Sequence, residues 1–189
     1  KNICEDGAAG VGQAVVRADI DTLSCVEKVR KAFTKTTSRA DRSAIGQFLT
    51  AAPIARFMAS LFEREVPIVR ILDPGAGTGA LFAALTERLI SRPHRPRSIE
   101  VLAYETDRNI VGHLEATVGL CRELCAQAGV AFQGIIRCED FISSAVSQLR
   151  ENLFAEMQDS FTHVILNPPY KKINSDTRTR RLLSTAGME

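Results

Sequence analysis

The residues with the clearest capacity for chemistry are Asn167-Pro168-Pro169-Tyr170, which directly follow an apolar run. An amine whose lone pair is delocalised into a ring is a poor nucleophile. The Asn167 side-chain oxygen and the Pro168 carbonyl can each accept one N–H of such an amine, which turns the lone pair toward an incoming methyl group. The prolines stiffen the turn, and the Tyr170 ring can stack on a planar target. The motif predicts methyl transfer to an amino nitrogen.

A second motif, Asp73-Pro74-Gly75-Ala76-Gly77-Thr78-Gly79, lies between an expected strand and an expected helix. Its glycines permit a tight turn and let a ligand lie against the backbone. The spacing is not that of dinucleotide-binding turns, and no Lys-Ser/Thr pair follows as in a phosphate loop. Glu105 ends the next expected strand, where a carboxylate can accept both hydroxyl protons of a ribose. The glycine-rich motif and Glu105 together predict a nucleoside cofactor without a 2′-phosphate.

Asp140-Phe141 follows the next apolar run. The carboxylate could accept a hydrogen bond from the exocyclic amine of an adenine, and the ring could stack on the base. A core phenylalanine beside a surface aspartate explains the pair equally well.

The elements that would position these residues form an alternating series after Pro67. We expect strands at residues 68–72, 99–104, 130–137 and 161–166, and helices at residues 79–90, 108–128 and 145–157. This alternation predicts an α/β fold, with a parallel sheet and helices on both faces. The last strand should be an unprotected edge.

The residues before Pro67 are expected to be mainly helical. Apolar side chains recur every three or four positions from Val11 to Phe33. A polar linker is expected at residues 34–43, and a second helix at residues 51–65 with Thr50 as its N-cap and Pro53 in its first turn. We divide the chain into an N-terminal helix and linker, residues 1–43, and a catalytic domain, residues 44–189.

The composition is that of a globular protein: 45% of the 189 residues are hydrophobic, 24% are charged and the net charge is +2. No apolar run approaches the roughly 20 residues that span a bilayer. The five cysteines include no CxxC pair. Cys121 and Cys125, four apart on an expected helix, are interpreted as core residues, and no metal site is predicted. Reduced thiols favour the cytoplasm.

In this order, the motifs resemble those of gamma-class N6-adenine DNA methyltransferases from bacterial restriction–modification systems, of type II and IIG. The resemblance begins at Gly46-Gln47-Phe48-Leu49-Thr50 and implies a Rossmann-like class I fold that uses S-adenosylmethionine. Gln47, Phe48 and Thr50 would close over the methionine end of the cofactor. Its other contacts would come from Asp73, Gly75, Gly77 and Gly79, from Glu105 and from Asp140-Phe141. The catalytic motif would be Asn167 to Tyr170.

The resemblance also implies partners and a further domain. The substrate would be an adenine flipped out of double-stranded DNA in the bacterial cytoplasm, with a restriction endonuclease in cis or in trans. The family carries later strands and a target-recognition domain, which we expect this sequence to lack, so that the sheet is truncated after its fourth strand. It also commonly has Thr-Pro where Thr50 is followed by Ala51.

A basic cluster follows the catalytic motif. It could contact phosphates around a flipped base, or be a solvated tail. Its members are Lys171, Lys172, Arg178, Arg180 and Arg181.

Other functions remain open to different degrees. A cytosine-C5 methylase needs a cysteine after a proline, and neither Pro168 nor Pro169 precedes one. Enzymes that methylate release-factor glutamines or ribosomal RNA amines share the Asn-Pro-Pro-Tyr chemistry but lack the Gly46 segment in this form. A third alternative is a module that binds S-adenosylmethionine without turnover.

Overall fold

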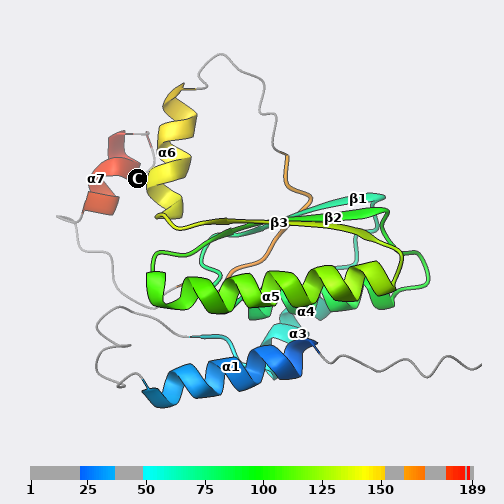
Figure 1. Ribbon diagram of the computed structural model, residues 1–189. Helices are drawn as coiled ribbons and strands as arrows, with labels where there is room; N and C mark the ends of the chain where they lie inside the picture. Colours follow the sequence, from blue (N-terminus) through cyan, green and yellow to red (C-terminus); the bar gives the residue numbers. More distant parts are fainter. Residues whose placement is uncertain (1–21, 37–48, 152–159, 169–177, 186, 188–189) are drawn as a thin grey trace, which may run out of the picture.

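The computed structural model describes residues 22–36, 49–151, 160–168, 178–185 and 187. Their centre is a four-stranded sheet with the order β3-β2-β1-β4, in which every pair of neighbours is parallel (Figure 1). The strands are β1 (Ile68–Asp73), β2 (Ser98–Tyr104), β3 (Ala131–Arg137) and β4 (His163–Val164). The predicted parallel sheet is confirmed, and β4 lies at its edge as expected.

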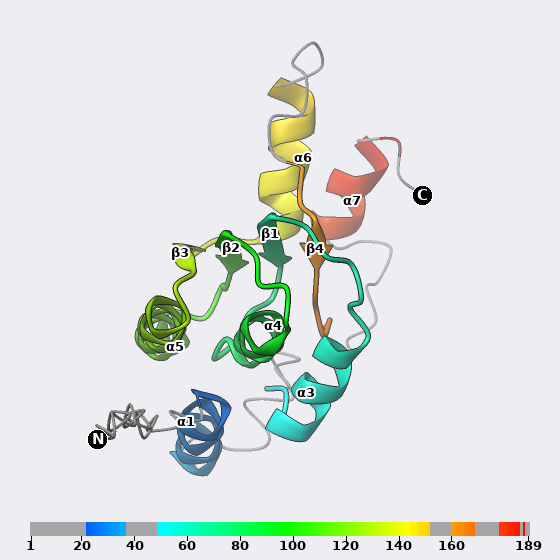
Figure 2. The ribbon, with the colours of Figure 1, turned by 90° about the vertical axis from the view of Figure 1, so that its right-hand side faces the viewer.

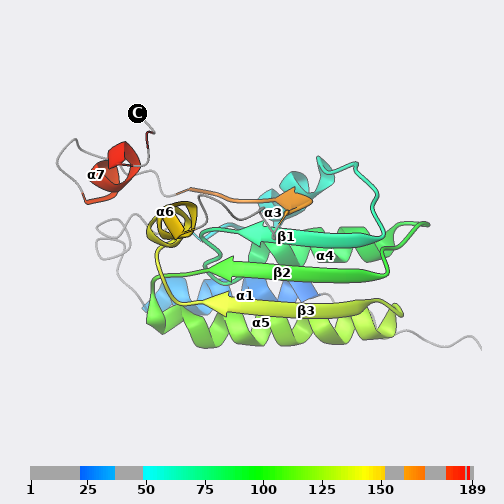
Figure 3. The ribbon, with the colours of Figure 1, turned by 90° about the horizontal axis from the view of Figure 1, so that it is seen from above.

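Helices cover the two faces of the sheet unequally. The helices are α1 (Thr22–Thr36), α3 (Ala52–Ser60), α4 (Ala80–Ser91), α5 (Arg108–Gln127), α6 (Phe141–Glu151) and α7 (Arg178–Thr185). Figure 2 shows α4 and α5 beneath one face, with α1 as a second layer below them and α3 beside α4. Helices α6 and α7 lie on the opposite side, near the carboxyl ends of the strands (Figure 3). The rest of that face carries half-exposed side chains, among them the Arg70–Glu100 ion pair.

The hydrophobic core lies between the sheet and α4. Val69 and Ile71 of β1 are fully buried, as are Phe82 and Leu85 of α4. Burying each such side chain stabilises the fold by about 1.5–3 kcal/mol. Helix α1 extends this core, because Leu23 and Val26 have almost no exposed surface.

The register of the strands brings their carboxyl ends to one edge of the sheet. Asp73 pairs with Ala103, and Leu72 pairs with both Leu102 and Val164. Strand β2 lies on one side of β1 and β4 on the other, so the chain changes direction across the sheet at β1. Such a switch point opens a crevice beyond the strand ends. The turns after β1, β2 and β4 therefore converge there.

Several predicted boundaries at the ends of helices are wrong. Residues 34–36, predicted as linker, continue α1, and the Thr34 hydroxyl donates to the carbonyl of Arg30 at 2.7 Å. Helix α3 ends at Ser60 rather than at residue 65, and the Phe62 ring beyond it packs on His163 of β4. Helix α6 begins at Phe141 rather than at residue 145.

Two other predictions, for the fourth strand and for the start of α3, need correction. The fourth strand is only two residues long, although the Ile165 N–H still donates to the Leu72 carbonyl at 3.0 Å. The N-cap of α3 is Ala51, whose own side chain makes no capping hydrogen bond, so Thr50 does not have the predicted capping role. Pro53 does lie in the first turn. Predictions for residues 1–21, 37–48, 152–159 and 169–177 fall outside the described residues.

Membrane-spanning helices and metal-binding clusters are both absent from the described residues. None of their helices is long and apolar enough to cross a membrane. Within the same ranges, no three His, Cys, Asp or Glu side chains are grouped so as to hold a metal ion. Cys121 and Cys125 are fully buried, which confirms them as core residues.

Glu27 of α1 supports the start of α3 from outside that helix. Its Oε2 accepts a hydrogen bond from the backbone N–H of Ala52 at 3.2 Å, and Arg30 donates to both carboxylate oxygens at 2.8 and 2.6 Å. The hydrogen bonds from Arg30 and, to a smaller extent, from Ala52 lower the pKa of Glu27 to about 2. The carboxylate supplies an acceptor that α3 otherwise lacks at this end.

We expect Glu27→Gln to lower the free energy of unfolding by about 1 kcal/mol at pH 7, because hydrogen bonds to a charged acceptor are lost. Since the folded pKa lies below the ordinary 4.5, the carboxylate stabilises the fold fully above pH 4.5 and progressively less as pH falls toward 2. Urea unfolding at a series of pH values measures this. Glu115→Gln, exposed on α5, is the control and should change stability by only a few tenths of a kcal/mol. A pH-independent difference between wild type and Glu27→Gln would contradict the assignment.

Candidate functional site

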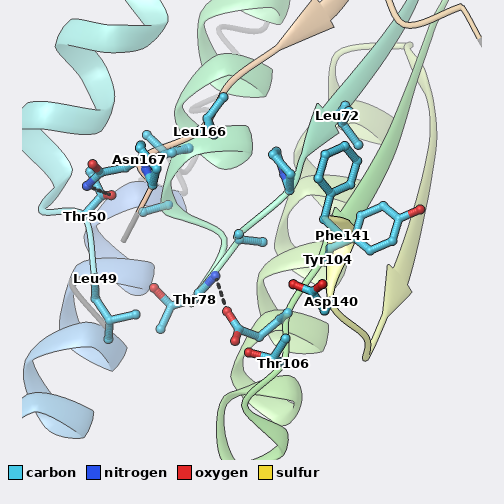
Figure 4. Close-up of a pocket in the computed structure, with 18 of the residues that line it drawn as sticks. Leu49, Thr50, Leu72, Thr78, Tyr104, Thr106, Asp140, Phe141, Leu166 and Asn167 are labelled. Atoms are coloured by element: carbon cyan, nitrogen blue, oxygen red, sulfur yellow. Dashed lines mark hydrogen bonds between the residues drawn. The ribbon is translucent and has the colours of Figure 1, made fainter. Parts of the chain in front are cut away.

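A pocket of about 490 Å³ lies where the strand-end turns converge, within the size range of small-molecule sites. Its wall is formed by the glycine-rich turn after β1, the end of β2, the start of α6, the segment before α3 and the turn after β4. Figure 4 shows Asn167 and Thr50 on one side and Tyr104, Asp140 and Phe141 on the other. Side chains from distant parts of the sequence therefore share one cavity.

The three glycines of the turn after β1 have different roles. Gly77 and Gly79 have positive φ angles of 55° and 83°. A Cβ on Gly79 would lie 2.7 Å from the Phe82 ring, and one on Gly77 would lie 2.8 Å from Leu49 Cδ2. A Cβ on Gly75 would meet no atom within 4 Å, and Gly75 lines the pocket. The fold thus requires Gly77 and Gly79, whereas Gly75 keeps room for a ligand.

Glu105 connects the glycine-rich turn to the end of β2. One carboxylate oxygen accepts the N–H of Gly77 and the other accepts the N–H of Asp107, both at 2.8 Å (Figure 4 draws the former). The residue is 9% exposed and lines the pocket. Because a carboxylate oxygen can accept more than one hydrogen bond, Glu105 can hold the turn and still accept from ligand hydroxyls.

Asp140 and Phe141 lie where α6 begins. Asp140 Oδ2 accepts from the backbone N–H of Ser143 at 2.8 Å and from its hydroxyl at 2.7 Å, so it caps the helix. Phe141 packs edge-to-face on Tyr104, with ring centroids 5.2 Å apart. Both rings line the pocket and form an apolar wall beside the Asp140 carboxylate. That combination suits a planar heterocycle with an exocyclic amine.

Asn167 lies in the turn after β4, in the wall of the same pocket. Its Nδ2 donates to the Thr50 hydroxyl at 3.1 Å, which links the segment before α3 to the turn after β4. Pro168, the next residue, also lines the pocket. The turn thus places Asn167 and Pro168 in the same pocket wall as the glycine-rich turn.

Most predicted site residues that the structure describes share this pocket. The wall contains Thr50, Gly75, Gly77, Glu105, Asp140, Phe141, Asn167 and Pro168, whereas Asp73 and Gly79 are not part of it. Arg180 and Arg181 are exposed on α7. The described residues do not include Gln47, Phe48, Pro169, Tyr170, Lys171 and Lys172, and the Arg178 side chain is likewise not described.

Other wall residues were not predicted. They include Leu49, Leu72, Thr78, Tyr104, Thr106 and Leu166. Each directly adjoins a motif residue or lies at the end of a strand. Their position next to a motif residue or at the end of an expected strand could therefore have identified them from the sequence.

Asp73 is fully buried at the end of β1. Among the described residues, neither of its carboxylate oxygens has a hydrogen-bond partner of normal geometry. Burial has the largest effect and raises its pKa to about 7. The N–H of Gly75 lowers the pKa, the charge of Glu105 raises it by a smaller amount, and the N–H of Phe82 lowers it least. A carboxyl that protonates near neutrality therefore lies under the glycine-rich turn.

Comparison with known proteins identifies relatives. A family model described as N-6 DNA methylase matches residues 27–184. The chain is 38% identical to Type II methyltransferase M.BsuBI of Bacillus subtilis over 152 residues, which are 79% of this chain and 29% of that protein. It is 33% identical to Type II methyltransferase M.PstI of Providencia stuartii over 177 residues, 94% of this chain and 34% of that protein. The chain spans about a third of the length of these relatives.

Because the Asp73 carboxyl is buried, we expect the free energy of unfolding to depend on pH. Between the ordinary pKa of 3.8 and the folded value of about 7, the native protein keeps a proton that the unfolded chain has released, so the free energy of unfolding should fall as pH rises. Asp73→Asn removes this slope, which is at most about 1.4 kcal/mol per pH unit. Chemical denaturation from pH 4 to pH 8 measures it, with the exposed Glu123→Gln as control. A constant difference between wild type and Asp73→Asn over that range would disprove the raised pKa.

Proposed function

We propose that this chain, which belongs to the N-6 DNA methylase family, binds S-adenosylmethionine in its pocket and carries the catalytic turn for methylation of adenine N6 in DNA. The observation that carries the proposal is the placement of Asn167 and Pro168 in the wall of the same pocket as Glu105 and Gly75. A cofactor held there would lie against the turn that activates the amine.

Each part of the pocket suits one part of the cofactor. Glu105 would accept the ribose hydroxyls, the Phe141 and Tyr104 rings would contact the adenine, and Asp140 Oδ1 would accept from its exocyclic amine. Gly75 leaves the backbone open to close approach. When bound, S-adenosylmethionine supplies an electrophilic methyl group on a sulfonium sulfur.

The catalytic turn would act by hydrogen bonding to the target amine. The Asn167 side-chain oxygen and the Pro168 carbonyl each accept one N–H of that amine, which withdraws its lone pair from conjugation and directs it outward. These acceptors are fixed before the reaction and lie where positive charge develops on the nitrogen. The product ammonium then loses a proton to solvent, so the turn needs no strong base.

The substrate that we infer is an adenine flipped out of double-stranded DNA. In the duplex, the adenine amino group is paired within the stack and cannot reach a turn in the wall of a pocket. Arg180 and Arg181 are exposed on α7, which packs beside α6 near the carboxyl ends of the strands, and they would contact phosphates. In a restriction–modification system, the partner is an endonuclease that acts in cis or in trans.

Two measurements on the full-length protein test the proposal. Calorimetry should detect binding of S-adenosylmethionine, and labelled methyl groups should appear on N6 of adenine in duplex DNA. Transfer to a glutamine-containing peptide or to ribosomal RNA instead would favour the alternative amino methyltransferases. Binding without transfer to any acceptor would indicate a cofactor-binding module. A folded protein without affinity for S-adenosylmethionine would refute the proposal.

Gly75→Ala should separate cofactor binding from folding. Because no protein atom lies within 4 Å of the added Cβ, the free energy of unfolding should change by less than about 0.5 kcal/mol, while affinity for S-adenosylmethionine should fall at least about tenfold. Gly112→Ala, which also has open space but lies on α5 outside the pocket, should leave affinity unchanged. Wild-type affinity in Gly75→Ala would place the cofactor elsewhere. Glu105 variants are less informative, since they also lose two backbone hydrogen bonds.

Asn167→Ala should separate binding from chemistry. We expect the dissociation constant for S-adenosylmethionine to stay within about threefold of wild type, and the single-turnover rate of methyl transfer to fall by about 10²–10³, as for loss of one preorganised group. Calorimetry measures the dissociation constant, and rapid-quench assays on the same preparation measure the rate of methyl transfer. A large loss of affinity with little loss of rate would show that Asn167 is a cofactor contact and not the catalytic acceptor.

A further inference from the structure

The amide of Asn167 has two chemically different ends, and only one of them can serve the proposed reaction. Its oxygen accepts hydrogen bonds, and its nitrogen only donates them. If the amide were reversed, its N–H groups would face the N–H groups of the target amine. Methyl transfer therefore needs an acceptor on the side of Asn167 that faces away from the target, to receive the Nδ2 hydrogens.

The structure contains such an acceptor. Asn167 Nδ2 donates to the Thr50 hydroxyl oxygen at 3.1 Å, although the two residues are 117 positions apart. Figure 4 shows the two side chains together at one side of the pocket. The side chain of Asn167 is partly buried, so an unpaired Nδ2 would lose free energy of solvation without compensation.

Thr50 is itself held from both sides. Leu49, before it, lies so close to the glycine-rich turn that a Cβ on Gly77 would approach Leu49 Cδ2 to 2.8 Å. After it, the N–H of Ala52 donates to Glu27 Oε2 at 3.2 Å. Helix α1 and the glycine-rich turn thus fix the Thr50 backbone, and the hydroxyl has a defined place beside Asn167.

We propose that Thr50 is a positioning residue for methyl transfer: its hydroxyl accepts from Asn167 Nδ2 and so directs the Asn167 oxygen toward the target amine. The inference rests on the proposed function of Asn167. It assigns Thr50 a role in the chemical step, separate from any contact with the cofactor. Helix capping, the role suggested by its sequence position, is not what the hydroxyl does.

The experiment compares Thr50→Val, which has nearly the same shape without a hydroxyl, with Thr50→Ser, which keeps the hydroxyl. In the full-length protein, Thr50→Val should lower the single-turnover rate by about tenfold to a hundredfold, as for a misplaced catalytic group. The dissociation constant for S-adenosylmethionine should stay within about threefold. Thr50→Ser should restore the rate to within about threefold of wild type. Thr86→Val, buried in α4 outside the pocket, is the matched control and should keep the wild-type rate.

A double-mutant cycle tests whether Thr50 acts through Asn167. If it does, Thr50→Val should cost no further rate in an Asn167→Ala background, because neighbours that act as a unit are not additive. Equal losses in both backgrounds, an unchanged rate in Thr50→Val, or an equal loss of cofactor affinity in Thr50→Val and Thr50→Ser would each overturn the inference.

A readout that is independent of turnover is the side-chain amide resonance of Asn167 in protein labelled with ¹⁵N-asparagine. Its absence from Asn167→Ala identifies the signal. It should shift and exchange faster with solvent in Thr50→Val, and stay unchanged in Thr86→Val. No change in Thr50→Val would overturn the inference. If wild type transfers no methyl group, the proposed function fails, and this measurement still decides whether Thr50 holds the amide.

Discussion

The carboxylate of Glu105 joins the two turns on which the pocket depends. It accepts the N–H of Gly77 from the turn after β1 and the N–H of Asp107 from the turn after β2. In the glycine-rich turn the N–H of Gly79 donates to the Ala76 carbonyl, whereas the N–H of Gly77 depends on Glu105. If it were unpaired at this depth, that N–H would cost about 1–3 kcal/mol. Glu105 satisfies it and also lines the pocket. The two turns that carry this contact both line the cavity, so its shape depends on Glu105.

Residues of the pocket wall serve the fold and the site together. Asp140 caps α6 through one oxygen, and Phe141 packs on Tyr104, which is itself almost completely buried. Gly75 is the exception, because nothing in the described protein requires it to be glycine. A substitution of Asp140 or Phe141 therefore changes stability and ligand affinity together, whereas Gly75 lies where the fold has left space. For other variants, a loss of ligand affinity has to be compared with the change in the free energy of unfolding of the same variant.

The features that depend on a local pattern of residues, namely the strands, the helices and the motifs between them, could be predicted from the sequence. Apolar runs of strand length that alternate with helical periodicity predicted the parallel sheet, and motifs at the ends of those runs had to meet at one edge once the strands were parallel. Contacts between distant segments could not be predicted in this way. The hydrogen bond from Asn167 to Thr50, the capping of α3 by Glu27 and the burial of Asp73 each depend on packing that no local pattern encodes. Thr50 is an example. Its place before a helix start that contains a proline suggested an N-cap, but in the folded chain its hydroxyl accepts a hydrogen bond from Asn167.

Helix α1 changes how the functional unit of this protein should be delimited. Motifs alone would start that unit near residue 44, yet the Glu27 carboxylate supports the first turn of α3, and Leu23 and Val26 fill space against the core. A fragment cut at the motif boundary would expose apolar surface on α4 and α5 and leave the Ala52 N–H without its acceptor. For anyone who dissects or transplants this domain, the boundary set by packing therefore lies before Thr22, outside the stretch in which the motifs occur.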